Sequence, residues 1–168
     1  VTGGTGTDTL ELASTVTGSV SLGGTTLSGI EVVDASAVTG DLTLTGNTSD
    51  ATTFKLGAGA ATVTGGSAAD TLKLTSGFTG ASVALAASDG QYNSIEVVDA
   101  SAVTGSLNIT GTTAAETITG AAGGGTIDGK GGADVLAGGN GNDTFMFYGS
   151  ETVTGGTGTD TLELASTV

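Results

Sequence analysis

The acidic residues that could do chemistry stand at the ends of short glycine-rich segments. GGNGND (138–143) and GGTGTD (155–160) each end in an Asp, and GGTGTD occurs a first time at 3–8. Glycine lets the backbone adopt the positive φ angles of tight turns, so carbonyl oxygens can point inward. Carbonyl and carboxylate oxygens are the ligands that Ca²⁺ prefers, six to eight of them at about 2.3–2.6 Å. These residue types therefore favour a calcium-binding turn.

The large apolar residues around these segments recur with a nine-residue period: Ile109, Ile118, Ile127, Leu136 and Phe145. In an α-helix this spacing would put successive members on opposite faces. A six-residue turn followed by a three-residue strand explains it, because two such units close one coil. In TLEL (9–12) and TLKL (71–74), leucines point inward, while Glu11 and Lys73 point outward. The sequence predicts an all-β fold, a parallel β-solenoid of the β-roll or β-helix type with short strands and GGxGxD turns.

The chain also repeats itself on a larger scale. Residues 1–16 recur without a change at 153–168, and IEVVDASAVTG stands at both 30–40 and 95–105. We interpret this as a tandem array of 152-residue units; an artificial duplication is the alternative. The predicted organisation has four parts: solenoid block A at 1–62, a related block B at 63–110, a nonapeptide β-roll at 111–152, and the start of the next repeat at 153–168.

The composition restricts what the chain can bind. Its 168 residues carry a net charge of −14, with three lysines, no arginine, and only 4% aromatic residues. Like charges at this density oppose compaction, so a fold becomes plausible if cations enter it. The same charge argues strongly against nucleic acid and anionic membranes as partners, because both need basic patches. No stretch approaches the roughly 18 apolar residues of a membrane span, so direct membrane insertion is not expected.

The nine-residue frames carry a family resemblance. Two frames match every defined position of G-G-x-G-x-D-x-U-x, two lack one glycine, and two are degenerate: GGNGNDTFM (138–146) and GGTGTDTLE (155–163); GKGGADVLA (129–137) and GGSAADTLK (65–73); GTTAAETIT (111–119) and GAAGGGTID (120–128). The pattern resembles the haemolysin-type calcium-binding nonapeptide of RTX proteins. A GGxGxDTLxL coil followed by SGIEVVDAS also looks like blocks of bacterial surface-layer and giant RTX-type adhesin proteins.

The resemblance implies several Ca²⁺ ions, each between the loops of successive coils on one edge, with partner loops about 18 residues apart. Loop 138–143 with loop 155–160 is then the best site, and Asp134 faces Glu116 on the other edge. Asp8 would pair with a preceding unit, whereas Asp70 has no full partner loop. The predicted ligands are Asp8, Asp70, Asp134, Asp143, Asp160, Gly3, Thr5, Gly6, Gly138, Asn140, Gly141, Gly155, Thr157, Gly158 and Glu116.

Two further acids, Asp34 and Asp99, follow apolar strands in the IEVVDASAVTG copies. For these an Asx-type turn or cap is favoured, with calcium ligation as the alternative. The alternative interpretation of all the Asp and Gly residues is that they only form turns, as these residue types often do. Repetition of near-complete motifs in one frame, on a strongly acidic chain, favours calcium.

Catalysis is not expected. Without His, Cys or Arg, the usual Ser–His, Cys–His and zinc sites cannot be assembled. Paired carboxylates remain, but they occupy repeating turn positions. We predict a calcium-dependent structural repeat of a secreted bacterial cell-surface protein (surface layer, filament or adhesin stalk) that associates head-to-tail; the resemblance implies type I secretion. The alternatives are the calcium-binding RTX module of a type I secreted enzyme or toxin, and an ice-binding solenoid, whose uniform threonine ranks are not visible.

Overall fold

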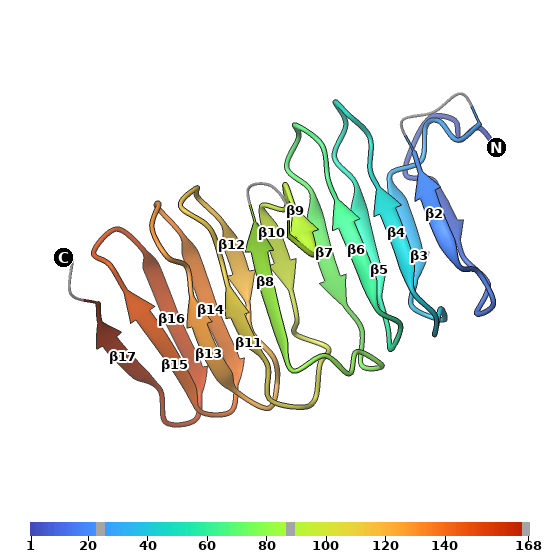
Figure 1. Ribbon diagram of the computed structural model, residues 1–168. Coiled ribbons are helices and arrows are strands. Elements are labelled where there is room, and N and C mark those ends of the chain that lie inside the picture. The colour runs from blue at the N-terminus through green and yellow to red at the C-terminus, as the bar shows by residue number, and fades with distance from the viewer. Residues whose placement is uncertain (23–25, 87–89, 166–168) are drawn as a thin grey trace.

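The computed structural model describes residues 1–22, 26–86 and 90–165, in which all regular structure is β-strand (Figure 1). The remaining residues belong to predicted block A (23–25), predicted block B (87–89) and the start of the next repeat (166–168), and these parts of the predictions lie outside the described residues. Within the described ranges, no helix is available to cross a membrane. The predicted parallel β-solenoid is confirmed: the chain winds through about eight turns.

Two parallel sheets form the walls of the solenoid. Sheet 1 contains, in spatial order, β1 (Thr9–Glu11), β3 (Val32–Ala35), β5 (Thr53–Leu56), β7 (Thr71–Leu74), β10 (Val97–Asp99), β12 (Thr117–Thr119), β14 (Val135–Asn140) and β16 (Thr152–Thr157). Sheet 2 contains β2 (Gly18–Ser21), β4 (Leu42–Thr45), β6 (Ala61–Thr64), β9 (Tyr92–Asn93), β8 (Ser82–Ala86), β11 (Asn108–Thr110), β13 (Gly125–Asp128), β15 (Asp143–Phe147) and β17 (Thr161–Leu164). Each strand leads to the other sheet, except that β8 leads to β9.

The length of a coil differs along the solenoid. Near the C-terminal end, neighbouring coils are related by steps of 18 and 17 residues, as in the pairs Thr117–Val135 and Val135–Thr152. Nearer the N-terminus, steps of 23 and 26 residues occur, as in Thr9–Val32 and Thr71–Val97. The short steps are those expected for two nine-residue units per coil, and the long ones accommodate larger turns.

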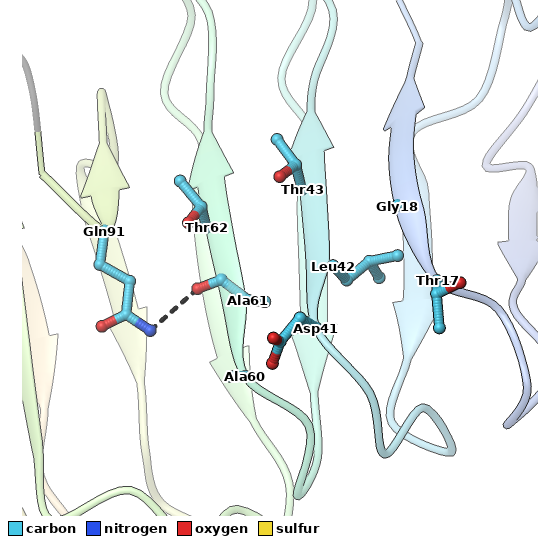
Figure 2. Close-up of a pocket in the computed structure, with 9 residues that line it drawn as sticks. All are labelled: Thr17, Gly18, Asp41, Leu42, Thr43, Ala60, Ala61, Thr62 and Gln91. Carbon is cyan, nitrogen blue, oxygen red and sulfur yellow. Dashed lines mark hydrogen bonds between the residues drawn. The ribbon is translucent and has the colours of Figure 1, made fainter.

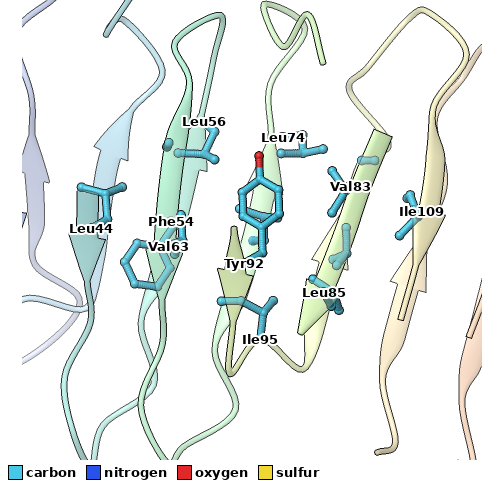
Figure 3. Close-up of a cluster of buried hydrophobic side chains, with 14 of the residues drawn as sticks. Leu44, Phe54, Leu56, Val63, Leu74, Val83, Leu85, Tyr92, Ile95 and Ile109 are labelled. Atoms are coloured by element: carbon cyan, nitrogen blue, oxygen red, sulfur yellow. The ribbon is translucent and has the colours of Figure 1, made fainter. Parts of the chain in front are cut away.

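The core is a thin apolar layer between the two sheets. Side chains alternate along each strand, so one or two apolar residues per strand point inward and meet the same position of the next coil. All five residues of the nine-residue series are at most 1% exposed: Ile109, Ile118, Ile127, Leu136 and Phe145. Figure 3 shows the middle of this layer, where Phe54, Val63 and Tyr92 lie among leucines and valines from neighbouring coils.

Sheet 2 contains one irregularity. The two-residue strand β9 lies between β6 and β8, pairing with Val63 and Thr64 on one side and with Leu85 and Ala86 on the other. Just before it, the Gln91 side chain donates its Nε2–H to the carbonyl oxygen of Ala61 at 2.9 Å (Figure 2). A side chain thus completes the backbone pairing of β6 where β9 is too short to do so.

Candidate calcium-binding turns

Acidic residues gather at the beginnings of the strands. We call the turns that lead into sheet 1 edge 1, and those that lead into sheet 2 edge 2. On edge 1, an acid stands directly before seven of the eight strands, and only β5 is preceded by Thr52. These acids are Asp8, Glu31, Asp70, Glu96, Glu116, Asp134 and Glu151. Because parallel strands begin at the same edge of a sheet, this edge carries a column of carboxylates about 4.8 Å apart per coil.

On edge 2, loops 138–143 and 155–160 lie on neighbouring coils, as the predicted best site requires. The backbone N–H of Asp143 donates to Asp160 Oδ1 at 3.0 Å, and Thr157 Oγ1 donates to Asn140 Oδ1 at 2.9 Å. The loops stack closely, since a methyl group on Gly138 would lie 2.5 Å from the carbonyl oxygen of Gly155. The two loops are therefore stacked in register, with Asp143 directly beside Asp160.

The glycines of these two loops are required by the backbone. Gly141 has a φ of 90° and Gly158 a φ of 128°, which is the left-handed region that residues with a Cβ rarely adopt. In addition, a methyl group on Gly158 would collide with the backbone carbonyl of Gly141 in the coil below. The third glycine of the motif thus allows both the turn and the close approach of successive turns.

The Asp143 carboxylate lies in an environment that is unfavourable for a negative charge. The residue is 2% exposed, and neither Oδ1 nor Oδ2 has a hydrogen-bond partner. Burial, and secondarily the negative charge of Asp160, raise the pKa of Asp143 above its ordinary value. Burying an anion without a compensating charge or hydrogen bond costs on the order of several kcal/mol. A cation bound at this position would therefore stabilise the folded protein.

A second such position lies on edge 1, where Asp134 and Glu116 meet as predicted. The backbone N–H of Glu116 donates to Asp134 Oδ1 at 2.9 Å, while Asp134 Oδ2 is buried without a partner. Burial raises the pKa of both carboxyl groups, and for Glu116 the charge of Asp134 adds to the effect. Thr112 donates to Glu116 through its backbone N–H, at 3.1 Å, and through its hydroxyl group.

These residues fit calcium. A hard dication would supply the missing partner of the buried carboxylate oxygens and reduce the repulsion between the acids of neighbouring coils. Within the described ranges, no group of three or more His, Cys, Asp or Glu side chains converges tightly enough to hold a metal by itself. Backbone carbonyl oxygens of the stacked glycine turns must therefore complete the ligand set, which agrees with the role of glycine in the motif.

Asp70 is held differently, although it also ends a glycine-rich turn. It is completely buried, but Gly66 N–H donates to its Oδ2 and Thr52 N–H to its Oδ1, each at 2.6 Å. Burial still raises its pKa. The protein thus satisfies both oxygens of Asp70, whereas it leaves those of Asp143 without a donor.

The first loop, at 3–8, sits on edge 1 beside residues 28–31 rather than beside a second glycine-rich loop. Asp8 Oδ2 accepts from Gly4 N–H at 2.7 Å, and Gly3 N–H donates to the Ser28 carbonyl at 2.9 Å. Gly6 has a φ of 112°, as the turn requires, and the predicted ligand Thr5 is exposed in this loop. The pairing of Asp8 with a preceding unit stays a prediction.

Three acids on edge 1 escaped the sequence analysis: Glu31, Glu96 and Glu151. Glu31 Oε2 accepts from Asp8 N–H at 2.9 Å, and Glu96 Oε2 accepts from Asp70 N–H at 2.8 Å. Neither follows a glycine-rich segment, so the motif could not reveal them. Alignment of the chain on its strands would have done so, because each stands directly before a strand in the same place as Asp134.

Asp34 and Asp99 do not join the acids at the turns, since they lie on the outer face of sheet 1. Each accepts the backbone N–H of the Ser two positions later at 3.1 Å, the Asx-type geometry. Lys55 Nζ lies 3.3 Å from Asp34, and Lys73 forms the equivalent ion pair with Asp99. Although burial opposes it, these hydrogen bonds lower the pKa of both carboxyl groups.

A groove of about 720 Å³ on the outer face of sheet 2 is a different kind of feature (Figure 2). Its lining is mostly threonine, alanine and backbone, and Asp41 is its one ionisable side chain among the described residues. Within the described residues, no second acid or base lines the groove with Asp41, so the acidic turns are the stronger candidate site.

The fold and the turns together define a calcium-binding repeat protein with a β-solenoid structure. Residues 110–145 and 147–164 match the family model of the RTX calcium-binding nonapeptide repeat, in four copies. The nonapeptide frames predicted this match, which covers about a third of the chain. No curated protein and no solved structure matches the chain.

Proposed function

We propose that the chain is a calcium-dependent structural segment of a secreted bacterial cell-surface protein, such as a surface layer, a surface filament or an adhesin stalk. The observation that carries the proposal is the pair of buried carboxylates with unpartnered oxygens, Asp134 and Asp143, in turns that stack directly on one another. RTX repeats occur in secreted bacterial proteins, which supports an extracellular location. The segment has no catalytic step in this proposal.

The proposed mechanism couples folding to external calcium. At low calcium, the acids of neighbouring coils repel one another, and the chain, with a net charge of −14, stays expanded. Outside the cell, Asp143 and Asp160 hold a cation between their two loops, and Asp134 with Glu116 does so on the other edge. The glycine turns then close and the coils stack, so the free energy of ion binding becomes free energy of folding.

The repeat of residues 1–16 at 153–168 supports a structural role over a single calcium module attached to an enzyme or toxin. A solenoid coil stacks on a copy of itself without a special interface. The open ends of the two sheets also offer unpaired backbone groups to another unit. Head-to-tail association of units, within a chain or between chains, follows from this proposal.

Circular dichroism with and without calcium tests the proposal. In EDTA the β-structure should be largely lost, and millimolar calcium should restore it in a cooperative transition that magnesium at the same ionic strength does not reproduce. Electron microscopy of the restored sample should show elongated particles. Complete β-structure in chelator, unchanged by calcium, would contradict the proposed coupling.

A further inference from the structure

Identical sequences occupy opposite sheets of this molecule. Residues 9–11 form β1 in sheet 1, whereas their copies, 161–163, lie in β17 of sheet 2. The turn before each strand follows the same rule, since Asp8 lies on edge 1 and Asp160 on edge 2. The local sequence is therefore compatible with both walls of the solenoid, and its position is set by how many half-turns precede it.

The number of half-turns per unit is odd. β1 is the first of the eight strands of sheet 1, so β16, the last, lies seven turns later, and β17 follows half a turn after that. The extra strand β9 does not change this parity, because β8 and β9 belong to the same sheet. One repeat of the sequence thus advances the solenoid by seven and a half turns.

The C-terminal end also indicates which segment covers it. Leu164 is 77% exposed in β17, whereas its copy, Leu12, is 6% exposed. In the first copy, β3 lies beside β1: Leu10 is in register with Val33, and Leu12 N–H donates to the Asp34 carbonyl at 2.9 Å. In the proposed array, a second copy of β3 therefore fits the exposed edge of β17.

We propose that successive 152-residue units alternate their faces, the following unit docking its β3 on β17 with the walls of the solenoid exchanged. This inference rests on the proposed tandem structural array. It makes each unit related to the next by a half-turn about the solenoid axis in addition to the translation along it.

The alternation has consequences because the two outer faces differ. The outer face of sheet 1 carries a column of charged side chains that are in register across four strands, Asp34, Lys55, Lys73 and Asp99. The same stretch of sheet 2 carries threonines, with Thr43 beside Thr62 and Thr45 beside Thr64. Each side of an array would show the charged column only in every second unit, so lateral contacts through it would repeat every two units.

The acidic edge changes sides as well. In a following unit, the copy of Glu31 would lie next to Asp160 on edge 2, because Glu31 lies next to Asp8 in the first copy. The pair Asp143 and Asp160 then stands at the boundary between units, where the acidic column of one unit passes to the opposite edge of the next. Carboxylates from both units would thus meet at the boundary.

A chain extended in phase by one further unit tests this, since the native sequence has no cysteine to interfere with labelling. Pairs of cysteines carrying pyrene report proximity by excimer fluorescence. Thr144→Cys with Val32→Cys of the second unit should be two strand spacings apart, about 9–10 Å, because Thr144 is in register with Thr161 and Thr9 with Val32. The competing pair is Val135→Cys, on the outer face of sheet 1, with the same second-unit residue.

The positive control is Thr126→Cys with Thr161→Cys, which are two strands apart on sheet 2 within one unit. Alternation predicts excimer emission from the control and from the Thr144 pair, and monomer emission from the Val135 pair. Excimer emission from the Val135 pair, or from the control alone, would overturn alternation while leaving the calcium-dependent solenoid intact. Monomer emission from the control in calcium would overturn both proposals.

A second cysteine pair distinguishes the absence of alternation from misfolding of the Thr144 variant. Met146→Cys with Asp34→Cys of the second unit has the same two-strand spacing, since Met146 is in register with Glu163 and Glu11 with Asp34. It should give excimer emission in every preparation whose circular dichroism matches that of the unlabelled chain. Monomer emission from this folded variant would count against alternation equally.

Discussion

Residues 1–110 and residues 111–165 contribute to the same two sheets, but the acidic residues of their turns differ in hydrogen bonding. In the first region, Asp70 receives a hydrogen bond on each carboxylate oxygen, and Asp8 accepts one from Gly4 N–H in its own turn. In the second region, Asp134 and Asp143 keep buried oxygens without a partner. The walls are common to the two regions, so the difference arises in the turns.

The contrast does not follow the length of the coil. Backbone N–H groups donate to a carboxylate of the next coil across long steps, as for Glu31 and Glu96, and across steps of 18 or 17 residues, as for Asp70, Asp134 and Asp160. Asp70 differs because Gly66 N–H, in its own turn, supplies a second donor, whereas Asp134 Oδ2 and both oxygens of Asp143 have none. The turns that leave a carboxylate oxygen without a donor therefore depend more strongly on an external cation.

The largest effect is expected from removing both carboxylates of the edge 2 site. Asp143→Ala with Asp160→Ala should raise the calcium midpoint of folding by at least about tenfold, because both carboxylate ligands proposed for the ion are lost. Circular dichroism during a calcium titration measures the midpoint. The matched control is Asp34→Ala with Asp99→Ala, which should move the midpoint by less than about twofold, as expected for partly exposed ion pairs. Equal shifts in the two double variants would remove the distinction between the regions.

Matched core substitutions come next. Leu72 and Leu136 are inward-facing residues of sheet 1, exposed by 0% and 1%, one in each region. Replacing either with Ala should cost about 2–4 kcal/mol of folding free energy. In saturating calcium the two losses, measured by urea unfolding, should be similar. The calcium midpoint should rise more for Leu136→Ala, because folding and ion binding are coupled most strongly in its region; a larger rise for Leu72→Ala would contradict the comparison.

The dependence of stability on pH should change sign with calcium. Burial raises the pKa values of Asp70, Glu116, Asp134 and Asp143, so without calcium the folded state binds protons more tightly than the unfolded state. The β-structure that forms in EDTA should therefore increase as the pH falls through these raised values toward the ordinary values of 4.5 for Glu and 3.8 for Asp. In calcium it should decrease over the same window, because protons compete with the ion.

Below that window, a second group of acids acts in the opposite direction. The pKa values of Asp34 and Asp99 are lowered, so their contribution is present above 3.8 and is lost as the pH falls through the lowered values. Circular dichroism at a series of pH values, in EDTA and at a calcium concentration near the folding midpoint, gives both curves. Parallel curves would show that the carboxyl groups with raised pKa values do not bind the ion.

The smallest effect is expected on the charged face of sheet 1. Lys55→Ala should cost no more than about 1 kcal/mol, because its ion pair with Asp34 is partly exposed and screened by salt. The side chains of Lys55 and Asp34 are 34% and 22% exposed. The loss should be the same with and without excess calcium and should shrink at high salt. Chemical denaturation at two ionic strengths provides the measurement.

Much of the fold follows from the sequence because its pattern is repeated. The nine-residue spacing of Ile109 to Phe145 predicts inward positions, and all five residues are buried. The spacing of the loops likewise predicts that Asp143 meets Asp160, and Asp134 meets Glu116. A short local pattern suffices here because each coil contacts only its neighbours.

Other features depend on long-range register and could not be read in advance. Glu31 and Glu96 join edge 1 through steps of 23 and 26 residues, which no motif defines. The side-chain bond from Gln91 to Ala61 bridges 30 residues of sequence. The placement of two identical segments in opposite sheets required the number of half-turns, and that number is fixed only when every strand is known.

Hydrogen exchange at single-residue resolution, in EDTA and in calcium, tests the central claim most directly. The account predicts that the amides of β14, β15 and β17 exchange rapidly in EDTA and become strongly protected in calcium, whereas those of β5 and β7 gain less protection. Asp143 and the residues that follow it in β15 should show the largest gain. Full protection of these strands in chelator, with no further gain on adding calcium, would show that the stacked turns close without an ion.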